Sequence, residues 1–258
     1  MELKTVIITQ ARTGSSRLPE KVLLQAVGKT FLQIHAERLC RSKQTNEVII
    51  ATTVNANDIK IVNEAARLGI KCSRGSEDDV LSRYYHAAKE AGADIVVRVT
   101  SDCPFADPAL IDELIVFFKN HQFDYVANVF VYTYPDGLDV EVMSYAALEY
   151  AYQHAVLKSE REHVTPYIRN QSDMEGGKTF KAYNYANAEK LTTLTRLTLD
   201  EPADLEVLSF LAETLGTERP WKDYYNYLEN NPHINKINNY ISANEGYEKS
   251  LQQDASNN

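Results

Sequence analysis

Short β-branched runs alternate with amphipathic helical patterns in the first half of the chain, and this alternation limits the folds it can adopt. Residues 5–9 (TVIIT), 47–52 (EVIIAT) and 93–100 (ADIVVRVT) have the composition of buried strands. Residues 31–40 and 78–91 between them carry apolar side chains at helical spacing. Because such alternation places helices on both faces of a mostly parallel sheet, we predict an α/β fold, a three-layer sandwich with a Rossmann-like sheet.

The second half alternates less regularly. We predict helices at residues 109–119, with Asp107 as N-cap, and at 202–215, which opens with proline and is followed by glycine. The threonine-rich run 191–199 (LTTLTRLTL) reads as a strand. We expect one domain over residues 1–243, followed by a polar tail, residues 244–258, that frays.

Net charge and cysteine usage exclude several classes of protein. The 27 Lys+Arg against 36 Asp+Glu give a net charge of −9, which disfavours a broad electrostatic grip on nucleic acid or an anionic membrane. The three cysteines fit neither a disulfide framework nor a zinc site. Residues 1–55 lack a secretory signal pattern, and the chain has no long apolar run. We therefore expect a cytoplasmic protein in which a local basic cluster would hold any anionic ligand.

Residues 10–21 (QARTGSSRLPEK) form such a cluster directly after the first predicted strand. The loop carries Arg12, Arg17 and Lys21, and Gly14 allows backbone N–H groups to approach a ligand. Three cations suit a polyphosphate. The Walker pattern GxxxxGK[ST] and the dinucleotide pattern GxGxxG are both absent. A solvated basic turn is the alternative interpretation of the loop.

Two carboxylates follow other predicted strands. Asp102 comes after residues 93–100, and Asp200 comes after residues 191–199. Each could cap a local turn or helix instead. Because ligands of open α/β sheets bind beyond the carboxyl ends of the strands, both acids could meet the basic loop and form a magnesium-nucleotide site.

Six segments in register resemble one known family. They are VIITQARTGSSRLPEKVL, RGSEDDVLSRYYHAA, VVRVTSDCP, TYPDGLDVEV, EREHVTPYI and TLDEPADLE, spread over about residues 6–206. Together they resemble the SpsF-type spore coat polysaccharide family, which belongs to the cytidylyltransferase group that includes CMP-sialic acid and CMP-Kdo synthetases. One departure is Glu20, where the family usually has glycine between proline and lysine.

The resemblance implies a nucleotidyltransferase fold, related to the GT-A architecture, and assigns roles to residues. Arg12 and Lys21 would be catalytic, and Asp102 and Asp200 would bind Mg²⁺. The nucleotide-binding residues that it implies are Ala11, Arg12, Gly14, Ser15, Arg17, Lys21, Arg74, Gly75 and Ser76.

Acceptor-binding residues are less defined by the pattern. Asp139 and Glu141 share one face of an extended segment, where they could bind sugar hydroxyls or an amine, although a plain hairpin loop explains the preceding Asp-Gly equally well. Glu160 and His163 are neighbours on a predicted helix and could approach the acceptor, with a structural histidine as the alternative.

The function implied by the resemblance is transfer of CMP from CTP to an acidic sugar of the nonulosonic type, with release of pyrophosphate. It also implies a homodimer, for which the aromatic C-terminal helices could supply an interface. Two alternatives stay open: a glycosyltransferase that uses a nucleotide-sugar donor, and a noncatalytic nucleotide-binding subunit. The Asp-x-Asp metal motif of many glycosyltransferases is absent, with residues 139–141 (DVE) as the nearest variant.

Overall fold

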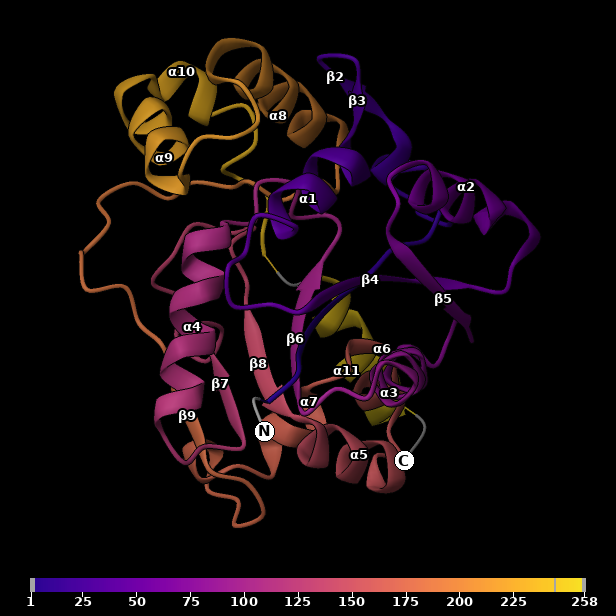
Figure 1. Ribbon diagram of the computed structural model, residues 1–258. Coiled ribbons are helices and arrows are strands. Elements are labelled where there is room, and N and C mark those ends of the chain that lie inside the picture. The colour runs from indigo at the N-terminus through magenta and orange to yellow at the C-terminus, as the bar shows by residue number, and fades with distance from the viewer. Residues whose placement is uncertain (1–2, 244, 257–258) are drawn as a thin grey trace.

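The computed structural model describes residues 3–243 and 245–256, and its centre is a twisted sheet (Figure 1). In this part of the chain seven strands pair in the order β5-β4-β1-β6-β8-β7-β9, and β2 and β3 form a separate hairpin. The strands β5, β4, β1 and β6 are parallel, whereas β8 runs antiparallel to both of its neighbours. The strands are β1 (Thr5–Gln10), β2 (Gln25–Ala26), β3 (Lys29–Thr30), β4 (Glu47–Thr53), β5 (Lys71–Gly75), β6 (Ile95–Thr100), β7 (Tyr125–Ala127), β8 (Glu141–Ser144) and β9 (Ala182–Asn184).

Helices cover both faces of this sheet. They are α1 (Phe31–Leu39), α2 (Ile59–Arg67), α3 (Val80–Ala91), α4 (Pro108–Asn120), α5 (Tyr145–His154), α6 (Lys158–His163), α7 (Pro166–Asn170), α8 (Pro202–Leu215), α9 (Trp221–Asn230), α10 (Pro232–Asn235) and α11 (Glu245–Ser256). Short 3-10 helices are η1 (Lys21–Leu23), η2 (Ala56–Asp58) and η3 (Asp173–Glu175). Among residues 3–243 and 245–256, no helix has both the length and the apolar character needed to span a bilayer.

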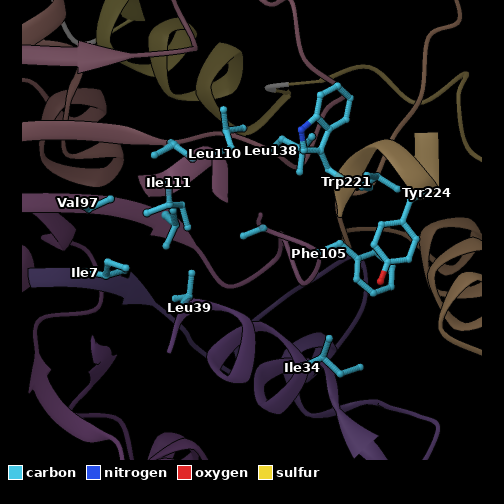
Figure 2. Close-up of a cluster of buried hydrophobic side chains, with 14 of the residues drawn as sticks. Ile7, Ile34, Leu39, Val97, Phe105, Leu110, Ile111, Leu138, Trp221 and Tyr224 are labelled. Atoms are coloured by element: carbon cyan, nitrogen blue, oxygen red, sulfur yellow. The ribbon is translucent and has the colours of Figure 1, made fainter. Parts of the chain in front are cut away.

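The side-chain alternation of β1 explains the layers. Val6 and Ile8 pack with α3 and α5 on one face, while Ile7 packs with α1 and α4 on the other, and all three are fully buried. Figure 2 shows the second of these cores, in which Phe105 stacks on Tyr224 of α9 with ring centroids 4.4 Å apart. The predicted three-layer α/β fold with a mostly parallel sheet is therefore confirmed.

Helix caps agree with the local sequence. The Asp107 carboxylate accepts hydrogen bonds from the N–H groups of Ala109 and Leu110 at the start of α4, where Pro108 occupies the first turn. The helix α3 ends at Gly92, whose φ of 61° is the left-handed conformation that favours glycine. These signals act within a few residues, which is why the sequence predicts them well.

Two predictions are wrong. Residues 191–199 form no strand of the sheet, and Arg196 makes only an isolated bridge with Asp136. The run is extended because Leu197 and Leu199 are fully buried, and their N–H groups donate to the backbone oxygens of Asp136 and Asp102 instead of to a strand ladder. The polar tail does not fray over residues 245–256, because it forms α11 and packs against α6.

Candidate active site

A cavity of about 540 Å³ opens at the carboxyl ends of β1 and β6. It is lined by the basic loop after β1, the loop after β6, the segment 196–200 and the turn between α6 and α7. Residues on the segment that leads into β8 complete the wall, together with Ser242, Gly246 and Tyr247 near the C-terminus. The structure thus brings together the three loops that the sequence places beyond strand ends, although the third follows an extended segment and not a strand.

A buried aspartate fixes the basic loop. Asp58 is 1% exposed, and its Oδ1 accepts hydrogen bonds of 2.7 Å from both the backbone N–H and the hydroxyl of Thr13. Within the loop, the N–H of Ser15 donates to the Thr13 carbonyl at 2.9 Å. Ala11, Gly14 and Ser15 all line the cavity, but the Ser15 N–H is already used inside the loop. The backbone contact to phosphate that the family resemblance implies for Ser15 is therefore not available in this conformation.

Lys21 joins the two predicted metal-binding carboxylates. Its Nζ lies 3.0 Å from Asp102 Oδ2 and 2.5 Å from Asp200 Oδ1, and the side chain is 14% exposed. Burial alone would lower the pKa of Lys21, but the charges of both aspartates raise it above its ordinary value. Burial would likewise raise the pKa of Asp102, yet the Lys21 ammonium holds it well below its usual range. Lys21 and Asp102 are therefore both charged at neutral pH.

Two further arginines lie on the same loop. Arg17 Nη2 is 3.2 Å from Asp200 Oδ2, and Arg17 Nη1 is 3.3 Å from Glu201 Oε1. Arg12 Nη1 lies 3.6 Å from Glu77, and the Arg12 side chain is nearly half exposed. Exposed ion pairs of this kind contribute little, so Arg12 can leave its partner for a phosphate at small cost.

Asp200 does not cap the helix that follows it. The N-cap of α8 is Glu201, and Asp204 Oδ2 accepts hydrogen bonds of 2.9 Å from the N–H groups of both Asp200 and Glu201. The Asp200 carboxylate is therefore left to contact Lys21 and Arg17. The helix-cap interpretation of this residue is wrong.

Arg196 is a residue of this site that the sequence analysis missed. It is 3% exposed, and its guanidinium contacts Asp204 Oδ1 at 2.9 Å, Asp136 Oδ2 at 2.5 Å and Asp200 Oδ2 at 3.3 Å. Burial would lower its pKa, but the bonds to these aspartates raise the pKa above the ordinary arginine value. An arginine within an otherwise apolar and threonine-rich run was the signal that could have identified it.

Glu141 is held by a separate buried network. It is 3% exposed, and its carboxylate pairs with Arg98 and accepts a hydrogen bond from the Tyr125 hydroxyl. Burial would raise the pKa of Glu141, but the Arg98 charge lowers it below its ordinary value. Although Glu141 lines the cavity, these partners already occupy much of its hydrogen-bonding capacity.

Asp139 faces the cavity two residues before Glu141. Burial first, and then the charges of Asp136 and Glu141, raise its pKa to about 7 from an ordinary value of 3.8. A carboxyl group that titrates near neutral pH can accept or release a proton at working pH. Asp139 is thus better suited to proton transfer than to a fixed charge.

This pKa shift predicts a pH-dependent stability. The folded chain holds the Asp139 proton up to about pH 7, whereas the unfolded chain releases it near pH 4, so the free energy of unfolding falls as pH rises through this window. We expect Asp139→Asn to raise that free energy by about 2 kcal/mol at pH 8, after allowance for solvent screening, and by little at pH 4. Urea denaturation in the presence of EDTA measures the free energy of unfolding of both proteins. An equal increase at pH 8 and pH 4 would contradict the raised pKa of Asp139.

Glu160 and His163, which the sequence predicts as an acceptor-binding pair, have different surroundings in the structure. His163 lines the cavity, and burial first, followed by the charge of Arg98, lowers its pKa to about 4. Glu160 is buried and lies outside the cavity lining. Its Oε2 accepts hydrogen bonds of 3.1 Å from the N–H groups of Val156 and Leu157, so it stabilises the start of α6. The structure therefore does not bring Glu160 to the cavity, and a sugar-binding role for it stays a prediction.

The segment Arg74, Gly75 and Ser76 also lies outside the cavity lining. Arg74 donates to the backbone oxygens of Thr53 and Asn55. Arg83, which the sequence analysis did not select, is 3% exposed and lines the cavity instead. A Cβ on Gly75 would lie 2.7 Å from Arg83 Cγ, so this glycine allows the arginine to pack there.

The donor set is suitable for one magnesium ion shared with a phosphate. Asp102 and Asp200 converge on one ammonium group, and Asp102 is held in its ionised form. The residues 3–243 and 245–256 contain no group of three or more His, Cys, Asp or Glu side chains arranged to hold a metal ion. Because Mg²⁺ commonly takes one or two carboxylates and completes its shell with water and substrate phosphates, these two acids fit it.

Glu20 adopts a left-handed backbone conformation, with φ of 54° and ψ of 25°, immediately before Lys21. Its carboxylate is exposed and pairs with Lys60. This conformation explains why glycine suits the position, because a Cβ there costs about 1 kcal/mol.

The strain at Glu20 predicts a difference between two substitutions. Glu20→Gly and Glu20→Ala both remove the ion pair with Lys60, but only alanine keeps a Cβ in the left-handed conformation. We expect the glycine variant to be more stable to unfolding than the alanine variant by about 1 kcal/mol. Thermal denaturation of both proteins measures the difference. An alanine variant at least as stable as the glycine variant would show that the backbone at Glu20 is not strained.

The sheet order and the charged cavity at its carboxyl edge place the chain in the nucleotidyltransferase class of α/β folds. A sequence model described as cytidylyltransferase matches residues 6–234. The chain belongs to the cytidylyltransferase family.

Relatives and solved structures agree with this assignment. The chain is 37% identical over 241 residues to an uncharacterized protein of Methanocaldococcus jannaschii, which covers 93% of this chain and 96% of that one. It is 31% identical over 228 residues to the spore coat polysaccharide biosynthesis protein SpsF of Bacillus subtilis, covering 83% of this chain and 88% of that protein. The expected resemblance to SpsF is confirmed.

A cytidylyltransferase structure from Leptospira borgpetersenii superposes with a TM-score of 0.84 at 34% identity, covering 91% of this chain and 97% of that one. A CMP-2-keto-3-deoxy-manno-octonic acid synthetase in complex with CTP has a TM-score of 0.61 at 20% identity, covering 82% and 99%. The second likeness shows a shared fold.

Proposed function

We propose that this protein transfers the CMP group of CTP to a hydroxyl of an acidic sugar of the nonulosonic type, for surface or spore-coat polysaccharide. The observation that carries the proposal is the convergence of Lys21 with Asp102 and Asp200 in one cavity with Arg12 and Arg17. Family membership, the name of the SpsF relative and the CTP complex of the structural neighbour support it.

The bond changes define what the residues must do. The sugar oxygen forms a bond to the α-phosphorus of CTP. The bond between this phosphorus and the oxygen that bridges the α- and β-phosphates breaks, and pyrophosphate leaves with the electron pair. Arg12, Arg17 and Lys21 donate to phosphate oxygens and stabilise the leaving group. Asp139, with its pKa of about 7, accepts the proton of the attacking hydroxyl.

Asp102 and Asp200 would hold Mg²⁺, which when bound supplies positive charge beside the phosphate oxygens. Lys21 then turns from the two carboxylates toward the triphosphate, so the same ammonium serves both states. Before the nucleotide arrives, Lys21 pairs with both carboxylates, and Arg17 and Arg196 add positive charge beside Asp200.

Pyrophosphate release tests the proposal. The purified protein with Mg²⁺ and CTP is incubated with N-acetylneuraminate, legionaminate, pseudaminate or 3-deoxy-manno-octulosonate, and ATP, GTP and UTP replace CTP in parallel. We expect pyrophosphate and a CMP-sugar with CTP and one or more of these acids. Sugar transfer from a nucleotide-sugar would instead indicate a glycosyltransferase, and nucleotide binding without any reaction would indicate a noncatalytic subunit.

A further inference from the structure

The C-terminal segment contributes a wall to the cavity. Ser242, Gly246 and Tyr247 line it together with residues of α6 and α7. Figure 1 shows α11 beside α6, away from the group formed by α8, α9 and α10. The family match ends at residue 234, so this wall lies beyond the part of the chain that defines the family.

Polar contacts hold α11 in place. Asp254 Oδ1 accepts a hydrogen bond of 3.1 Å from the Lys158 N–H, and both Asp254 oxygens lie within hydrogen-bond distance of the Ser159 N–H. Asp254 thereby satisfies free N–H groups at the start of α6. Ser250 is 4% exposed, and its hydroxyl lies 3.0 Å from His163 Nε2 and 3.1 Å from Glu162 Oε2. The helix therefore contacts the two residues through which α6 borders the cavity.

Glu162 and His163 precede a strained turn that is centred on Val164. Val164 has φ of 73° and ψ of −56°, and the Thr165 N–H donates to the His163 carbonyl at 2.9 Å. These values describe a classic γ-turn, which is rare and costly for a β-branched residue. Val164 is fully buried, while His163 and Thr165 on either side line the cavity. Such strain persists where surrounding structure fixes it, and α11 supplies part of that structure.

This wall faces the Glu141 end of the cavity. Thr165 hydrogen-bonds to Glu141. Burial first, and then the charge of Arg98, lowers the pKa of His163, while the charges of Glu162 and Glu141 act in the opposite direction. Tyr247 lies edge-on to His163 with ring centroids 5.2 Å apart. Arg17 and Lys21, which we propose to bind the triphosphate, contact Asp200 instead. The triphosphate end of the cavity is therefore distinct from the Glu141 end.

Arg169 gives this end a positive charge. Its guanidinium lies over the Phe130 ring, 5.3 Å from the centroid, and both residues line the cavity. Burial would lower the pKa of Arg169, but Tyr125 and the charge of Glu141 raise it above the ordinary arginine value. An arginine beside an aromatic ring is suited to a ligand that combines an anionic group with a body that packs against the ring.

We propose that α11 is the acceptor-selecting wall of the site: Tyr247 packs against the bound acidic acceptor, and the helix excludes water from the acceptor end. This inference rests on the proposed function and adds a specificity-determining residue outside the matched family region. When the wall is removed, water can attack the α-phosphorus in place of the sugar, forming CMP and pyrophosphate from CTP.

Three variants test the wall. Tyr247→Ala opens it, a chain shortened to end at Ser242 removes it, and Leu251→Ala changes an exposed residue of the same helix as the matched control. Calorimetry measures CTP binding. Steady-state kinetics give the acceptor KM and kcat for N-acetylneuraminate and for 3-deoxy-manno-octulosonate. A third assay measures the CMP that forms from CTP without any acceptor.

For Tyr247→Ala we expect the ratio of kcat/KM between the two sugars to change about tenfold, with CTP affinity held within roughly twofold. Acceptor-free CMP formation rises about threefold in both wall variants. The inference is overturned if CTP affinity changes as much as the ratio of kcat/KM between the two sugars. It is also overturned if neither that ratio nor acceptor-free CMP formation changes. Failure of the wild-type protein to bind CTP would instead refute the proposed function.

Discussion

Replacing Lys21 with alanine is expected to lower kcat for pyrophosphate release by about 10²-fold or more, on the scale of losing one preorganised donor to a transition-state oxyanion. The ammonium contacts both Asp102 and Asp200, and the Lys21 side chain is 14% exposed. Its loss removes charge from the leaving pyrophosphate and leaves two carboxylates to repel each other. The measurement is steady-state release at saturating Mg²⁺ and CTP.

The matched control is Lys29→Ala, because Lys29 pairs with Glu37 on the surface and lies outside the cavity lining. We expect this variant to keep wild-type kcat. Circular dichroism of both variants checks that the fold is intact. A Lys21→Ala enzyme that releases pyrophosphate at the wild-type rate would remove this residue from the mechanism.

Substitution of Arg196 by methionine is expected to lower the free energy of unfolding by about 3–5 kcal/mol, because it strands buried carboxylates without their partner. Arg196 contacts Asp136, Asp200 and Asp204, of which Asp204 is fully buried. Urea denaturation at pH 7 measures the loss.

Arg219→Met serves as the comparison, since the Arg219 side chain is 62% exposed and its pair with Asp223 is 3.9 Å long. That variant should lose less than about 1 kcal/mol. The account of the Arg196 network fails when the two substitutions cost the same. At pH 4 the penalty of Arg196→Met should also shrink, because protonation relieves the unpaired acids.

The core strands were predictable because their signal is local. Residues 5–10, 47–53 and 95–100 are apolar and β-branched, and they form the centre of the sheet. The strands β8 and β9 are only 4 and 3 residues long, and pairing with distant neighbours defines them. The run 191–199 has strand composition, but it pairs only through the isolated bridge of Arg196 with Asp136, so tertiary context overrides its propensity.

Part of the site followed from the same reasoning. Asp102 and Lys21 lie in loops at the carboxyl edge of the sheet, where their meeting could be expected from topology. The ion pairs of Arg98 with Glu141 and of Arg196 with Asp136 join positions more than 40 residues apart. No spacing rule in the sequence identifies such partners.

The C-terminal helix shows the limit of composition. Residues 245–256 are polar, and a polar helix gains little from burial of apolar area. Its docking depends on a few hydrogen bonds: Asp254 accepts from the Lys158 N–H of α6, and the Ser250 hydroxyl bonds to His163 Nε2. These contacts can be seen only once α6 is placed.

A crystal structure of the protein with CTP and Mg²⁺ tests the central claim most directly. The account predicts the triphosphate between Arg12, Arg17 and Lys21, with the metal ion on Asp102 and Asp200. A nucleotide bound elsewhere, or phosphates that touch none of these side chains while Lys21 still bridges the two aspartates, would contradict it.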